Sequence, residues 1–175
     1  MKILITGLNG FIGKSLRSLL SENHQLMSLS RNNNFDPLDK NIEIITGDFS
    51  RPNEWGEKVV KFSPDYCIHL AWEGLPDYSL EKCIINLNKN LLFLNFLSKI
   101  GIPNIIFTGS CYEYGNYKGR LEEDFVPKEP PIFGITKLTI FNYLESICMR
   151  NNINFKWARI FFSYGPNQRF NFLIP

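Results

Sequence analysis

The sequence has 175 residues, of which 44% are hydrophobic and 21% are charged, the proportions of one ordinary soluble domain. A chain of this length can bury about two thirds of its unfolded surface, which is enough for a single core. The formal net charge is only +2, and acidic and basic residues are interspersed, so neither a nucleic acid nor a membrane surface is expected as a partner.

The N-terminal run and the cysteines bear on cellular location. Residues 1–7 contain too few apolar residues for a signal peptide, and no apolar run approaches the roughly 18 residues of a membrane span. The four cysteines are far apart and match no metal-ligand or redox spacing; they are Cys67, Cys83, Cys111 and Cys148. We therefore expect reduced cysteines, no metal site and a cytoplasmic protein.

Segments with strand and helix character alternate along the chain. Strands are expected at Ile3–Thr6, Gln25–Ser30, Ile42–Thr46, Tyr66–Ala71, Ile105–Thr108 and Phe155–Phe161. Helical spacing predicts helices at Phe11–Ser21, Glu54–Phe62, Leu80–Ile100 and Phe133–Asn151. Asn32–Asn34 with Asp36-Pro37 predicts a turn. The polar stretch Gly109–Pro131 is long enough to suggest a function.

This alternation determines the expected fold class. Strands that alternate with helices pair in parallel through right-handed crossovers. Six strands with five crossovers are what a doubly wound dinucleotide-binding fold requires. We therefore expect residues 1–175 to form a single α/β domain, a doubly wound Rossmann fold with a mostly parallel six-stranded sheet.

A glycine-rich turn follows the first predicted strand. In Gly7-Leu8-Asn9-Gly10-Phe11-Ile12-Gly13, a strand precedes the first glycine and a helix opens inside the motif. The first glycine permits the tight turn, the second lets the backbone approach a pyrophosphate, and the third allows the helix to pack closely on the strand. A structural turn is the alternative. The candidate cofactor-binding residues here are Gly7, Asn9, Gly10, Phe11, Ile12 and Gly13.

A series of short motifs follows the glycine-rich turn in a fixed order. They are Gly47-Asp48, His69-Leu70-Ala71, Thr108-Gly109-Ser110, Tyr114-Gly115, Phe133 with Lys137, and Arg159 with Tyr164-Gly165-Pro166. This series resembles the extended short-chain dehydrogenases/reductases, the NAD-dependent epimerase/dehydratase family. The resemblance implies that Asp48 and Phe49 border the adenine. It also implies that Ala71 lies beneath the nicotinamide side of the cofactor, with Leu70 in the same cofactor-binding set.

The residues that end the second predicted strand bear on cofactor choice. NAD-specific proteins place an acidic residue there, which binds the ribose hydroxyls. This sequence has Ser30-Arg31 instead, and a guanidinium suits a 2′-phosphate through paired hydrogen bonds. We therefore expect NADP as the cofactor and keep NAD as the alternative. A solvated surface arginine is the simplest other explanation of Arg31.

Phe133 stands where the resemblance implies a catalytic tyrosine. The run Pro131-Ile132-Phe133-Gly134-Ile135-Thr136-Lys137 resembles Tyr-x-x-x-Lys with its tyrosine replaced. In this superfamily the tyrosine exchanges a proton with the substrate, and the lysine one helical turn on lowers the tyrosine pKa and holds the nicotinamide ribose. Lys137 keeps its place, but a lost general acid removes about 10²–10⁴-fold in rate. An engineered replacement is a second explanation of Phe133.

Ser110 matches the third catalytic residue of this family, which donates a hydrogen bond to the substrate oxygen; an ordinary strand-end serine is the alternative. Cys111 and Tyr112 follow, where the family's dehydratases carry an Asp-Glu pair. Without those carboxylates there is no acid and base to eliminate water. Tyr112 belongs to the loop expected to line the same pocket, so its hydroxyl is a candidate to replace the missing one.

Two loop segments are most similar to the nucleotide-activated 4-keto-6-deoxyhexose reductases, such as the dTDP-6-deoxy-L-talose 4-dehydrogenases. They are His69–Pro76 with Tyr78, and Gly109–Gly115. The resemblance implies a nucleotide-sugar substrate, expected to be dTDP-linked. Members of this branch continue into a sugar-binding domain that is largely absent from these 175 residues. A fragment or a truncated gene product is therefore expected.

Two functions remain open. The first is an NAD(P)-dependent nucleotide-sugar oxidoreductase or epimerase that is impaired by Phe133. The second is a catalytically inactive dinucleotide-binding module that acts as a sensor or as a partner subunit. A longer reading frame with a sugar-binding domain favours the first, and an authentic stop after Pro175 favours the second.

The resemblance also implies a homodimer that pairs through the helices Leu80–Ile100 and Phe133–Asn151. The first of these helices is apolar on more than one face. Its leucines exceed what one face of a sheet needs, so we expect part of this set to face a partner: Leu87, Leu91, Leu94 and Leu97.

Overall fold

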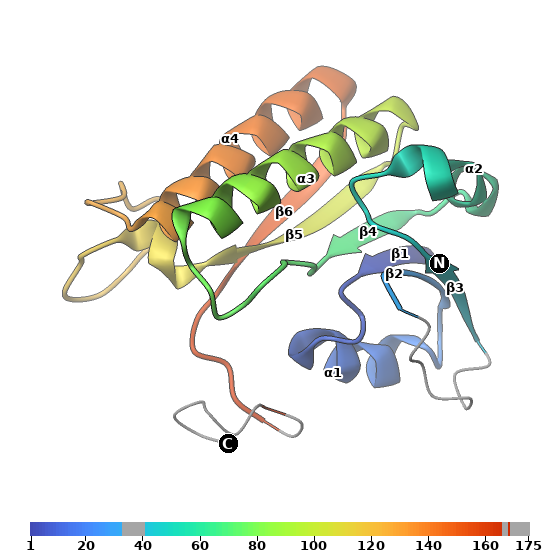
Figure 1. The fold of residues 1–175 in the computed structure, drawn as a ribbon, viewed down its shortest axis with the longest axis horizontal. Helices are drawn as coiled ribbons and strands as arrows, with labels where there is room; N and C mark the ends of the chain where they lie inside the picture. The colour runs from blue at the N-terminus through green and yellow to red at the C-terminus, as the bar shows by residue number, and fades with distance from the viewer. Residues whose placement is uncertain (33–40, 166–167, 169–175) are drawn as a thin grey trace.

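Six parallel strands form one sheet in the computed structural model, which describes residues 1–32, 41–165 and 168 (Figure 1). The strand order is β3-β2-β1-β4-β5-β6, and every neighbouring pair is parallel. The strands are β1 (Lys2–Thr6), β2 (Gln25–Ser30), β3 (Ile42–Thr46), β4 (Tyr66–His69), β5 (Asn104–Ser110) and β6 (Asn154–Ile160). This order confirms the predicted doubly wound Rossmann fold.

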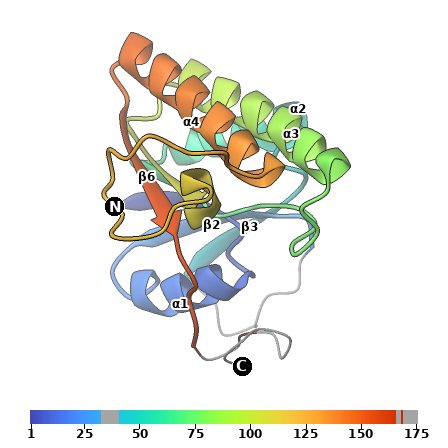
Figure 2. The ribbon, with the colours of Figure 1, turned by 90° about the vertical axis from the view of Figure 1, so that its left-hand side faces the viewer.

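Helices cover the two faces of the sheet unequally. Figure 1 shows α2, α3 and α4 on one face and α1 on the other, and Figure 2 shows α3 and α4 running side by side. The bounds are α1 (Phe11–Leu20), α2 (Pro52–Phe62), α3 (Leu80–Lys99), η1 (Cys111–Tyr114) and α4 (Ile132–Asn151). The predicted turn at 32–37 lies outside the described residues except for Asn32.

Two hydrophobic cores lie on opposite faces of the sheet. Ile3 and Ile5 of β1 face α1, while Leu4 between them faces the core formed with α2, α3 and α4. Successive side chains of a strand point to opposite faces, so a strand buried on both sides is apolar at nearly every position. The apolar run Ile3-Leu4-Ile5 within β1 is explained by the place of this strand in the middle of the sheet.

β4 ends at His69, two residues before the predicted end at Ala71. The amide of Leu70 still donates to the carbonyl of Thr6 at 3.1 Å, but the chain then passes over the turn that follows β1. Gly7 has a φ of +76°, and a Cβ there would lie 2.8 Å from the amide nitrogen of Ala71. The close approach of these two loops therefore requires glycine at position 7.

The remaining helix boundaries differ from the sequence prediction by only a few residues. α2 begins at Pro52 rather than Glu54, because proline fits the first turn of a helix, where its missing N–H costs nothing. α3 begins after Ser79, whose side chain accepts from the amide of Lys82 at 3.4 Å, a common N-cap arrangement.

The predicted partner-facing leucines of α3 are largely covered within the chain. Leu94 and Leu97 are fully buried in the core, and Leu87 packs against it. The prediction is therefore wrong for Leu94 and Leu97, because α3 packs on both the sheet and α4. The exposed apolar side chains of α3 and α4 are a different set, which includes Ile84, Leu92, Ile135 and Met149.

No helix within the described ranges is both long enough and apolar enough to cross a membrane.

Candidate functional site

The segments singled out in the sequence meet at one edge of the sheet. Because all six strands are parallel, their carboxyl ends lie together, and ligands of such sheets bind outside those ends. The glycine-rich turn follows β1, Ser30-Arg31 ends β2, Asp48 follows β3, Leu70-Ala71 follows β4, and Ser110 ends β5. The first turns of α4, with Phe133 and Lys137, pack against η1 and β5 beside them.

The glycine-rich turn has the geometry of a phosphate cradle. The amide of Gly10 donates to the carbonyl of Gly7 at 2.9 Å, and a Cβ on Gly13 would overlap that same carbonyl oxygen. α1 begins after Gly10 with no capping side chain and no acidic residue in its first turn. The backbone N–H groups in the first turn of a helix have no partner within the helix, and they attract anions. This turn therefore fits the pyrophosphate of a dinucleotide.

Asn9, Phe11 and Ile12, predicted in the same set, are partly buried in or next to this turn. Ser30 lies at the end of β2, where its carbonyl accepts from the amide of Gly47 at 2.9 Å. The next residue, Arg31, has a side chain that is 60% exposed and lies 3.5 Å from Glu73. The structure thus brings the glycine turn and Arg31 to the same edge of the sheet.

Asp48 is held by a cation and by its own loop. Its carboxylate accepts from the amide and the hydroxyl of Ser50, at 2.9 and 2.8 Å, and from Nζ of Lys89 at 2.6 Å. Burial alone would raise the pKa of Asp48, but the hydrogen bonds from Lys89 and Ser50 lower it to about 2. Asp48 is therefore ionised throughout the physiological range.

Phe49 belongs to the core rather than to an open surface. Its ring lies 5.1 Å from the His69 ring and 5.6 Å from the Phe93 ring. His69 is fully buried between Thr6 Oγ1, at 2.7 Å from Nδ1, and Asn90 Oδ1, at 2.8 Å from Nε2. Burial lowers the pKa of His69 to about 3, so this histidine is neutral and holds two elements together.

Ser110 and Lys137 lie at the opposite end of the candidate site. The hydroxyl of Ser110 accepts from the amide of Tyr112 at 3.3 Å. Lys137 is only 4% exposed; its Nζ donates to the carbonyl of Thr108 at 2.8 Å and lies 4.1 Å from the centre of the Trp72 ring. Burial lowers the pKa of Lys137 to about 7.

Aromatic rings surround Phe133. The ring centres of Tyr78, Trp72 and Tyr112 lie 4.8, 5.1 and 5.7 Å from that of Phe133. Tyr78 is thus nearer to the replaced tyrosine position than Tyr112, the residue predicted as a substitute. Sequence reasoning treated Tyr78 only as part of a loop motif, because nothing in the sequence specifies that this loop folds over α4.

The exposures of the two tyrosines are similar, at 37% for Tyr78 and 39% for Tyr112. Burial, together with the nearby Tyr112 and Cys111, raises the pKa of Tyr78 above that of an ordinary phenol. A phenol is already a poor acid–base group at neutral pH. Neither the position nor the environment of Tyr78 therefore reproduces an activated catalytic tyrosine.

Glu113 is a buried carboxylate that the sequence analysis missed. It accepts from the amide of Ser110 at 2.6 Å, from Trp157 Nε1 at 2.9 Å and from Arg159 Nε at 2.8 Å. Ser110 and Glu113 form a capping box around η1. The Ser-x-x-Glu spacing of this motif is visible in the sequence and could have identified it. Glu113 fixes the backbone that carries Ser110.

Within the described part of the chain, no group of three or more His, Cys, Asp or Glu side chains is arranged to hold a metal ion. Arg159, which the resemblance included among the family motifs, contributes its guanidinium to Glu113 and to the hydroxyl of Tyr114 at 3.3 Å.

The strand order and the glycine-lined helix N-terminus together define a dinucleotide-binding domain of the doubly wound type. A family model, described as the NAD dependent epimerase/dehydratase family, matches residues 3–173. The chain belongs to that family.

Curated relatives agree with this assignment. The chain is 26% identical over 184 residues to dTDP-6-deoxy-L-talose 4-dehydrogenase (NAD(+)) of Aggregatibacter actinomycetemcomitans, covering 98% of this chain and 64% of the relative. It is 30% identical over 180 residues to dTDP-4-dehydro-6-deoxyglucose reductase of Escherichia coli, covering 95% of this chain and 57% of the relative. The chain thus spans somewhat more than half the length of these proteins.

Solved structures share the fold. UDP-glucose 4-epimerase of Thermotoga maritima, solved with UDP-glucose, superposes with a TM-score of 0.83 at 21% identity, over 97% of this chain and 58% of that chain.

Proposed function

We propose that this chain is the dinucleotide-binding part of an NAD(P)-dependent nucleotide-sugar oxidoreductase or epimerase of the 4-keto-6-deoxyhexose reductase type. The observation that carries the proposal is the uncapped N-terminus of α1 at the Gly7–Gly13 turn, on the same sheet edge as Ser110 and Lys137. The names of the two relatives, both acting on dTDP-linked 6-deoxy sugars, support a dTDP-linked substrate.

NADP is the proposed cofactor. Arg31 follows β2, and its side chain is 60% exposed, so a 2′-phosphate can form paired hydrogen bonds with its guanidinium. NAD remains the alternative, since one relative carries NAD(+) in its name.

Titration calorimetry of the chain with NADP and with NAD tests whether it binds a dinucleotide. Gly10→Val is the variant expected to bind both dinucleotides more weakly. The backbone at Gly10, with φ −73° and ψ 174°, is one that valine adopts readily. Its Cβ would lie 3.1 Å from the Gly7 carbonyl oxygen, which a shift of a few tenths of an ångström would relieve, so the variant should fold. A side chain at this position would occupy the space of the pyrophosphate. Each lost hydrogen bond to a charged group costs about 1.5–3 kcal/mol, so we expect the affinity to fall about 10–100-fold or more. Failure of the unaltered chain to bind either dinucleotide would contradict the proposal.

In the proposed reaction the nicotinamide ring supplies or accepts the hydride. Ser110 would donate a hydrogen bond to the substrate oxygen, and Lys137 would hold the nicotinamide ribose. Phe133 has no hydroxyl, so the proton that must accompany hydride transfer has no donor at that position. The loss of a general acid corresponds to about 10²–10⁴-fold in rate. We therefore propose that the chain binds its cofactor but is impaired in turnover.

The inactive-module alternative is favoured by one observation. Phe133 is packed among Trp72, Tyr78 and Tyr112, so the catalytic position is filled by apolar contacts rather than left open for a substrate oxygen. A dinucleotide-binding module that acts as a sensor or a partner subunit needs the glycine turn but not a proton donor.

A homodimer through α3 and α4 is also part of the proposal. Its support is the exposed apolar side chains on the outer faces of these two adjacent helices: Ile84, Leu92, Ile135 and Met149. Exposed apolar side chains on neighbouring helices are a feature of interfaces between subunits.

A further inference from the structure

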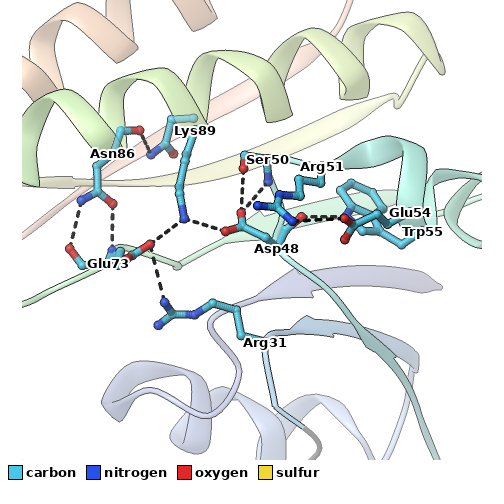
Figure 3. A network of polar contacts seen from close by, with 10 residues as sticks. Arg31, Asp48, Ser50, Arg51, Glu54, Trp55, Glu73, Asn86 and Lys89 are labelled. Atoms are coloured by element: carbon cyan, nitrogen blue, oxygen red, sulfur yellow. Dashed lines mark hydrogen bonds and ion pairs between the residues drawn. The ribbon is translucent and has the colours of Figure 1, made fainter.

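Four charged side chains from four segments form one network at the carboxyl edge of the sheet (Figure 3). Nζ of Lys89, on α3, lies 2.6 Å from Asp48 Oδ2 and 2.7 Å from Glu73 Oε2. The same Glu73 oxygen lies 3.5 Å from Nη1 of Arg31. One carboxylate, that of Glu73, is therefore shared between two cations.

Glu73 is held in place by its backbone as well as by its side chain. The buried amide of Asn86 accepts from the Glu73 amide at 2.8 Å and donates to the Glu73 carbonyl at 2.9 Å, as Figure 3 shows. The hydrogen bond from Lys89 lowers the pKa of Glu73, so this carboxyl group is ionised at neutral pH. Arg31 is the more exposed partner of its pair with Glu73, since the side chains are 60% and 25% exposed, and their 3.5 Å contact is longer than the contacts of Lys89.

The contact between Arg31 and Glu73 crosses the crevice of the dinucleotide. β1 lies between β2 and β4 in the sheet, Arg31 follows β2, and Glu73 follows β4. An ion pair between them passes over the carboxyl end of β1, where the Gly7–Gly13 turn begins. The cation expected to receive a 2′-phosphate is thus already paired with a fixed carboxylate.

We propose that Glu73 is a cofactor-specificity residue that opposes Arg31 and limits the preference of this chain for NADP over NAD. The inference rests on the proposed dinucleotide binding. A 2′-phosphate must draw Arg31 away from Glu73 and then lies near a carboxylate of like charge. NAD carries a neutral hydroxyl at this position, so it leaves the ion pair intact and meets no repulsion.

Titration calorimetry with NADP and with NAD tests this inference through one ratio, the Kd for NAD divided by the Kd for NADP. Exposed ion pairs contribute about 0.2–1 kcal/mol, so Glu73→Gln should raise the ratio by a factor of roughly 1.4 to 5. Arg31→Gln should lower the ratio, and in that background Glu73→Gln should have a smaller effect.

Lys89→Gln provides a second test, in which the same Kd ratio should change in the opposite direction. Without Lys89, the charges of Glu73 and Asp48 are no longer neutralised, so the ratio should fall. If Glu73 and Lys89 only stabilised the fold, their variants would not change the Kd ratio in opposite directions. The matched control is Glu54→Gln. Glu54 lies in the first turn of α2 and forms an ion pair with Arg51 at 3.4 Å. Breaking this pair should leave the ratio unchanged.

An unchanged or lowered ratio in Glu73→Gln, or a raised ratio in Lys89→Gln, would overturn the inference and leave the proposed function standing. Absence of binding of both dinucleotides to the unaltered chain would overturn the proposed function and this inference together.

Discussion

The two ends of the candidate site are built from opposite kinds of side chain. Beside the glycine-rich turn, Arg31, Asp48, Glu73 and Lys89 satisfy one another's charges. At the other end, Phe133 lies among aromatic rings, and Lys137 is buried against Trp72. The first end offers charged side chains and backbone amides to a ligand, while at the second end the position proposed to need a catalytic hydroxyl carries Phe133.

This contrast separates binding from catalysis in one domain. The phosphate cradle depends on backbone geometry and on the absence of side chains at Gly10 and Gly13, which no change at position 133 affects. Proton transfer depends on a single hydroxyl group at the right place. A chain can therefore lose its general acid and keep its cofactor site.

The largest expected effect is the restoration of that hydroxyl. We expect Phe133→Tyr to raise turnover of a dTDP-4-keto-6-deoxyhexose by about 10²–10⁴-fold, because Lys137 still follows one helical turn later. The measurement is NADPH consumption followed by absorbance.

Controls for this variant are Tyr78→Phe and Tyr112→Phe, which remove the two nearby hydroxyls. If the unaltered chain already turns over at a rate usual for enzymes, about 1–10³ per second, the impairment is disproved. Loss of that activity in one control would then identify the substitute proton donor.

The next largest effect concerns the support beneath Ser110. Removing one partner of a buried ion pair costs about 3–5 kcal/mol, so we expect Glu113→Ala to lower the free energy of unfolding by that amount. Urea unfolding measures it, with the exposed Glu122→Ala as control. A loss as small as that of the control would show that Glu113 is not needed to hold Ser110 and Arg159.

Lys137 should make stability depend on pH in the alkaline range. Burial lowers its pKa to about 7, so between pH 7 and the ordinary lysine pKa the unfolded chain binds more protons than the folded one. The free energy of unfolding should therefore rise as the pH rises through this range, by on the order of a few kcal/mol.

Urea unfolding at several pH values, compared between the chain and Lys137→Met, checks this expectation. The variant should be the more stable at pH 6, and the difference should shrink as the pH is raised toward 10. The surface variant Lys58→Met should keep the pH dependence of the unaltered chain. If the free energy of unfolding of Lys137→Met depends on pH in the same way as that of the unaltered chain, burial does not destabilise the charged form of Lys137.

The smallest effect is expected at the outer face of α3. Burying one leucine side chain contributes about 1.5–3 kcal/mol, so Leu92→Gln should weaken self-association without unfolding the chain. Sedimentation velocity at micromolar concentration measures the shift toward monomer. Val60→Gln on α2 is the matched control, since Val60 is 55% exposed and Leu92 is 53% exposed. A monomeric unaltered chain would contradict the homodimer.

The sequence alone determined the class of fold and the position of the phosphate cradle. Both follow from local patterns: alternating strand and helix periodicity, and three glycines between a strand and a helix. The spacing that predicts a replaced catalytic tyrosine was visible for the same reason, since Phe133 and Lys137 are separated by one turn of a single helix.

Only the tertiary structure decided which side chains meet across the site. Lys89 reaches Asp48 and Glu73, which are 41 and 16 positions away, and Arg31 reaches Glu73 from the other side of β1. Such contacts depend on strand order and on how far each loop extends, which no local pattern encodes. The burial of Leu94 and Leu97 was missed for the same reason, because a helix that packs on both a sheet and another helix needs two apolar faces.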